Sequence, residues 1–142
     1  MSFFKTFLGH YNRHQAASPY LTNFVTGGIL GGTGDIICQK SFNDENTPFD
    51  YQRFASMLTF GAVYSGGFST LVYSSYSRFP KFLINTPAKM GLTCTLVDNF
   101  LHVPLLYTPA FYVMTGLMQG RTLAESTTTL RSGYLTSLGS CW

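Results

Sequence analysis

The chain has 142 residues, which is room for one domain, and its composition is unlike that of a soluble protein. Only 11% of the residues are charged, against roughly a quarter in an ordinary soluble domain. The mean hydropathy of +0.11 is low for a protein that crosses a membrane several times. We therefore expect membrane spans with polar interiors rich in Gly, Ser and Thr. The net charge of +3 is spread along the chain, so no nucleic-acid partner is expected.

The N-terminal segment is predicted to be an uncleaved amphipathic helix lying at the membrane interface. Its apolar face would carry most of the aromatic side chains, with Lys5 and Arg13 supplying charge. A mitochondrial presequence is the alternative, although the segment is short of arginine. His10 and His14 have a spacing that suits zinc, but without a third ligand nearby we favour side chains that reach toward the interface. The expected apolar face comprises Phe3, Phe4, Phe7, Leu8 and Tyr11.

Long stretches without charged residues predict an all-α membrane bundle of about three transmembrane helices, forming a single domain over residues 1–142. Pro104 and Pro109 are expected to kink or break the third span, because each removes a backbone donor. The basic residues place the N-terminus on the matrix or cytosolic side. The predicted spans are 19–39, 54–77 and 90–119, the polar loops are 40–53 and 78–89, and the tail is 120–142.

Glycines four residues apart dominate the first predicted span, and such glycines let another backbone approach closely. We favour packing between spans of the same chain, and self-association is the alternative. Gly116 and Gly120 repeat the pattern more weakly. The expected packing glycines are Gly27, Gly28, Gly31, Gly32 and Gly34.

Two polar pairs lie inside the predicted spans, Asp35 with Gln39 and Asp98 with His102, each spaced to share a helix face. Ionisable groups in a membrane are candidates for a functional site, here a polar route for a small solute or a proton. The favoured alternative is that they lie near the interface or bond neighbouring helices. No phosphate loop, nucleophile elbow or zinc motif is visible, so we expect no enzyme, no metal and no cofactor.

These segments together resemble the Mpv-type family, also called the 22-kilodalton peroxisomal membrane protein family. Residues 34–39 (GDIICQ) match its G-D-x-x-x-Q motif, and residues 50–53 (DYQR) match its D-x-x-R motif. Residues 18–20 (SPY) and 26–30 (TGGIL) also agree. Tyr73 occupies the place of a family tyrosine, and residues 98–104 resemble D-Q-x-x-x-x-P.

The chain departs from the family pattern at several places. The family's G-P-x-x-H-x-W-Y reads GGFSTLVY over residues 66–73, and Asn99 stands in place of glutamine. The chain stops at Trp142, about where the family reaches its first conserved tryptophan. We therefore expect a bundle that lacks the family's last span and leaves one face to be covered by another protein.

The resemblance implies a protein of the mitochondrial inner membrane, or alternatively of the peroxisomal membrane, without known enzymatic chemistry. We expect a structural or accessory subunit of an inner-membrane assembly such as a respiratory complex or the ATP synthase. Its partners would be membrane lipids and the membrane subunits that cover the exposed face. A channel or transporter for small solutes or ions is the alternative, and a lipid-binding or membrane-shaping role is a third reading.

Overall fold

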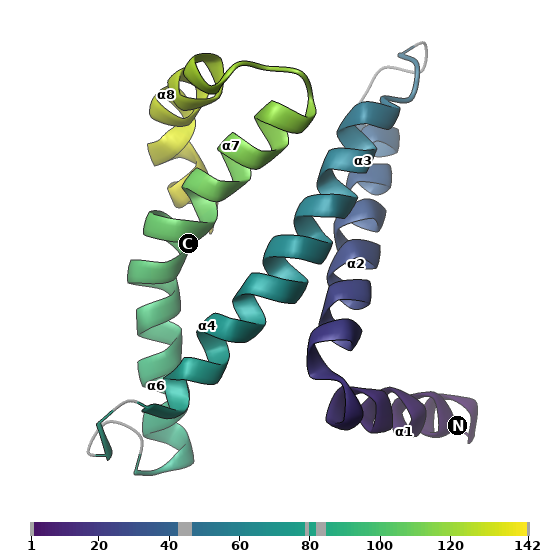
Figure 1. Ribbon diagram of the computed structural model, residues 1–142, viewed down its shortest axis with the longest axis vertical. Coiled ribbons are helices and arrows are strands. Elements are labelled where there is room, and N and C mark those ends of the chain that lie inside the picture. Colours follow the sequence, from purple (N-terminus) through teal and green to yellow (C-terminus); the bar gives the residue numbers. More distant parts are fainter. Residues whose placement is uncertain (1, 43–46, 79, 82–84, 142) are drawn as a thin grey trace. The chain divides into compact units, whose positions relative to one another are not determined.

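The described part of the chain is helical, and no strand occurs in it, as the sequence predicts. The computed structural model divides into two compact units at the junction of Val72 and Tyr73, and each unit is described by itself (Figure 1). Residues 43–46 and 82–84 of the predicted loops, with Phe79 and Trp142, lie outside the described residues. The structure describes residues 2–42, 47–78, 80–81 and 85–141.

The first unit begins with two helices that meet at a sharp bend. Helix α1 (Ser2–Ala17) corresponds to the predicted interfacial helix, and α2 (Pro19–Phe42) contains the first predicted span. Pro19 opens α2, a position where its missing N–H costs nothing. Figure 1 shows α1 turned across the direction of α2. The backbone N–H of Ser18 donates to His14 O at 2.8 Å, and the N–H of Thr22 donates to Ser18 O at 3.0 Å, so hydrogen bonds flank the bend on both sides.

The helix that packs against α2 runs from Tyr51 to Arg78 through changing helical types. It comprises α3 (Tyr51–Phe60), the π-helix η1 (Gly61–Phe68), α4 (Ser69–Ser75) and the 3₁₀ turn η2 (Tyr76–Arg78). Asp50 starts it as an N-cap, accepting the backbone N–H of Arg53 at 2.8 Å. The predicted span 54–77 falls inside this helix; its crossing of a membrane stays a prediction.

In the second unit, α6 (Pro87–Val97), the π-helix η3 (Asp98–Tyr107) and α7 (Thr108–Met118) follow one another without a gap. Among the described helices, this 32-residue run alone is both long and apolar enough to cross a bilayer. Thr86 caps its start by accepting the N–H of Lys89 at 3.3 Å. The α2 and α3–η2 helices are less apolar because Gly, Ser and Thr recur along them.

The prolines do not break the third helix; η3 absorbs Pro104 by widening to the π form. At its end the N–H of Thr108 donates to Val103 O, five residues back. A wider turn relaxes the clash that proline makes with the carbonyl four residues earlier. Pro109 then stands in the first turn of α7, where it is tolerated. Figure 1 shows the axis bending between α6 and α7.

Most of the predicted tail, residues 120–142, forms a helix, α8 (Leu123–Cys141). Gly120 ends α7 in the left-handed conformation, with φ of 80°. Its N–H donates to Leu117 O at 3.0 Å, and the Arg121 N–H donates to Gly116 O at 2.9 Å. These two bonds form a Schellman cap, which turns the chain so that α8 folds back on α7.

Candidate functional site

The glycine seam, which we define as Gly27, Gly28, Gly31 and Gly32, joins α2 to α3 and η1. A Cβ added to Gly27 would collide with Gly61 O and come within 2.9 Å of the Gly66 backbone nitrogen. The atoms that it would meet are backbone, so the two helices touch main chain to main chain. The seam therefore packs spans of one chain together, and self-association is not needed to explain it.

The other seam glycines meet side chains or backbone of the same neighbouring helix. A Cβ on Gly28 would lie 3.2 Å from Ala62 Cβ, and one on Gly32 would lie 3.1 Å from the Phe54 ring. Gly34 was predicted to belong with them, and this is corrected: a Cβ there would meet no atom within 4 Å. By spacing Gly34 lies on the same helix face as Gly27 and Gly31, seven and three residues earlier, so helical phase does not account for the difference.

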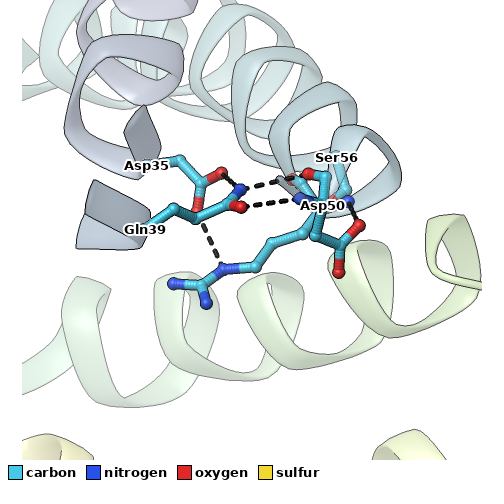
Figure 2. A network of polar contacts seen from close by, with 5 residues as sticks. Asp35, Gln39, Asp50 and Ser56 are labelled. Carbon is cyan, nitrogen blue, oxygen red and sulfur yellow. Dashed lines mark hydrogen bonds and ion pairs between the residues drawn. The ribbon is translucent and has the colours of Figure 1, made fainter. Parts of the chain in front are cut away.

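Beyond the glycine seam, a network of polar groups also joins α2 to α3 (Figure 2). The Asp35 side chain is 2% exposed and its Oδ1 lies 2.8 Å from Arg53 Nε. Its Oδ2 accepts a hydrogen bond from Gln39 Nε2 at 2.6 Å. The buried carboxylate thus has a cation on one oxygen and an amide donor on the other. Such pairing is what makes a buried charge tolerable.

Gln39 also fixes the chain segment that enters α3. Its Oε1 accepts the Asp50 backbone N–H at 2.8 Å, and its Nε2 donates to Asp50 O at 3.0 Å. This reciprocal pair mimics one rung of a β-ladder and holds the N-cap residue against α2. Ser56, fully buried one turn into α3, donates to Arg53 O at 2.7 Å. The network is consequently a clamp between helices.

Asp50, Arg53 and Ser56 belong to this clamp but not to the predicted site residues. In the sequence, Asp50 and Arg53 stand out only as a motif, three residues apart, before the second predicted span. Their spacing is that of an N-cap carboxylate and the N–H it accepts, and it places the arginine on the first turn of α3. The signal in the sequence is a polar pair in one predicted span and an arginine directly before the next span.

In the second unit, Asp98 and His102 are brought together in η3, joined by Tyr73. His102 Nδ1 lies 2.7 Å from Asp98 Oδ1, and Tyr73 Oη donates to the same oxygen at 3.1 Å. The His102 side chain is 4% exposed, whereas that of Asp98 is 27% exposed. Unlike Asp35, Asp98 therefore keeps part of its carboxylate open, within the helix that is long enough to span a bilayer.

In the second unit, small and hydroxyl-bearing residues join α8 to α7 and to η3. A Cβ on Gly116 would collide with Ser126 Oγ, so Gly116 is a contact point between these helices. Tyr112 Oη lies 2.7 Å from Ser137 Oγ, and Tyr134 Oη donates to Pro104 O at 3.0 Å. The weaker glycine pattern is therefore divided: Gly116 packs, while Gly120 is the helix cap.

The side chains in the described ranges hold no group of three or more His, Cys, Asp or Glu residues that could bind a metal ion. Cys38 and Cys94 are free thiols in different units. The structure thus contains two polar sites. One is the buried clamp around Asp35, and the other is the partly exposed pair of Asp98 and His102. Glycine-mediated helix contact and hydroxyl bonds between helices are typical of helical membrane proteins, and this is the class to which the chain belongs.

Comparisons with known proteins identify the group within this class. The chain is 42% identical over 104 residues to "PXMP2/4 family protein 2" of Dictyostelium discoideum, across 70% of the chain and half of that relative. It is 26% identical over 129 residues to "Mitochondrial inner membrane protein Mpv17" of Danio rerio, across 90% of the chain and 71% of the relative. It is 25% identical over 146 residues to "Protein SYM1" of Kluyveromyces lactis, across 96% and 70%.

The chain belongs to the Mpv17/PMP22 family, as the sequence motifs predict. No family model and no solved structure matches it. The chain spans half the length of the Dictyostelium relative and about 70% of the other two. It is a membrane protein of the mitochondrial inner membrane, with the peroxisomal membrane as the alternative.

Proposed function

We propose that the chain is a non-enzymatic packing subunit within an assembly of the mitochondrial inner membrane. One observation carries this proposal: the polar groups of the first unit are used to hold helices together. Asp35 and Gln39, the candidates for a polar route, are buried and bonded to Arg53 and Asp50. A side chain that lines an aqueous path must exchange hydrogen-bond partners with water or solute. Asp35 and Gln39 instead bond to other side chains and to backbone of the protein.

The outer faces of the helices support a role in packing. Apolar side chains at the outside of η3, such as Leu101 and Leu105, are 53% and 62% exposed. In a membrane protein such faces meet lipid or other spans, and association between spans relies on close packing. We propose that neighbouring subunits, of the kind found in a respiratory complex or the ATP synthase, cover part of this face, with lipid covering the rest.

The test is blue-native electrophoresis of mitochondria that carry the tagged full chain. A subunit is expected to migrate with a large assembly, and the double variant L101A/L105A should release it to a small species. Ile37→Ala, also at an exposed apolar position, is the matched control and should leave migration unchanged. Migration of the unaltered chain only as a small free species would refute the proposal.

A small-solute or ion channel is the second candidate, and the half-open Asp98 favours it. An aspartate side chain that is 27% exposed, in a helix long and apolar enough to span a bilayer, can meet a cation or a solute. Reconstitution of the purified chain into liposomes separates the two functions. If the protein conducts ions and Asp98→Leu abolishes the current while Ile37→Leu does not, the channel replaces the packing subunit as the function.

A further inference from the structure

We infer that the elbow between α1 and α2 is a binding site for one anionic phospholipid, whose acyl chain lies in the groove and whose phosphate lies beside His10 and His14. The groove has a volume of about 660 Å³ and is lined mainly by apolar side chains of both helices. This volume is within the range of about 300–1,000 Å³ typical of small-molecule sites. The groove lies wholly within the first unit.

The apolar side chains that line this groove are exposed in the isolated chain. Phe7 on α1 is 56% exposed, and Leu21 and Val25 on α2 are 65% and 51% exposed. They line the groove together because α1 turns across the direction of α2, as the ribbon in Figure 1 shows for the two helices. Because α2 contains a predicted span and α1 lies across it, the groove between them matches a lipid, which has an acyl chain along the span and a headgroup at the interface.

The basic residues near the groove favour a lipid with an anionic headgroup. His10 and His14 line the groove, and a ring N–H is a hydrogen-bond donor to a phosphate oxygen. The first 34 residues also contain Lys5 and Arg13 but no aspartate or glutamate. Basic segments beside a span attract anionic lipids. A second copy of the chain would bring another α1 of the same charge into the groove, which disfavours the copy as occupant.

The experiment uses the purified full chain in nanodiscs. The probes are a phosphatidylglycerol with a photoreactive acyl chain and the phosphatidylcholine with the same chains, with crosslinks mapped by peptide mass spectrometry. We expect phosphatidylglycerol to label residues 7–14 and 21–30 several-fold more than phosphatidylcholine does. Val25→Trp or Leu21→Trp, which fill the groove from exposed positions, should lower this labelling several-fold. Ile37→Trp on the outside of α2 is the control and should not.

Three results would overturn the inference. Even labelling along all exposed faces of α2 would mean ordinary surrounding lipid. Equal labelling by the two lipids would remove the preference for an anionic headgroup. Crosslinks between two α1 helices in place of lipid adducts would make a second copy the occupant. None of these results depends on membership of an assembly, so failure here and failure of the packing-subunit proposal are distinguishable.

Discussion

Replacing a seam glycine by alanine should destabilise the first unit, and Gly27 is the sharpest place to test it. The new Cβ would overlap Gly61 O and stand 2.9 Å from the Gly66 nitrogen. Both neighbours are main chain, so relief requires the helices to separate. Overpacking of this kind costs about 1–3 kcal/mol. The gain in helix propensity from glycine to alanine, about 1 kcal/mol, offsets part of it.

Gly34→Ala is the matched control, since Gly34 lies on the same helix and its Cβ would meet no atom within 4 Å. Both variants gain the same propensity, so the difference between their unfolding free energies isolates the overpacking cost of about 1–3 kcal/mol. The assay is thermal or SDS-induced unfolding of the purified chain in mild detergent, followed by circular dichroism. Equal stability of the two variants would refute the main-chain contact between α2 and η1.

Three further predictions follow from single contacts. Arg53→Met should lower the unfolding free energy by about 2 kcal/mol in the same assay, because Asp35 then stays buried without its cation, although the one-third exposed arginine limits the loss. Gly120→Ala should lower the unfolding free energy by about 1 kcal/mol and so lower the thermal midpoint, since alanine is strained at φ of 80°. An unchanged midpoint would contradict the role of Gly120 as the cap of α7. The N–H and hydroxyl of Thr122 lower the pKa of Glu125 below 4.5, so its contribution is present above that pH and is lost as the pH falls through the lowered pKa. A thermal midpoint measured against pH should therefore fall more steeply in acid for the unaltered chain than for Glu125→Gln, which keeps the shape of the cap without the charge.

The helical class and the approximate extent of most helices follow from the sequence. The long uncharged stretches and the polar segments between them predict both, because a bilayer penalises charged residues whatever the fold. The family also followed from sequence, through motifs such as residues 34–39. The bounds of α8 did not follow, because its polar, weakly periodic sequence is stabilised by contacts with α7 that no local pattern records.

The roles of the individual residues depend on how the helices pack. The tertiary structure separated Gly27, which touches main chain, from Gly34, where a Cβ would meet no atom of the described residues within 4 Å. It likewise separated Gly116, which packs, from Gly120, which ends a helix. It also joined Asp35 to Arg53 across two helices. Spacing along a chain fixes which residues share a helix face, but the partner of that face depends on how helices pack, and that is a property of the folded chain.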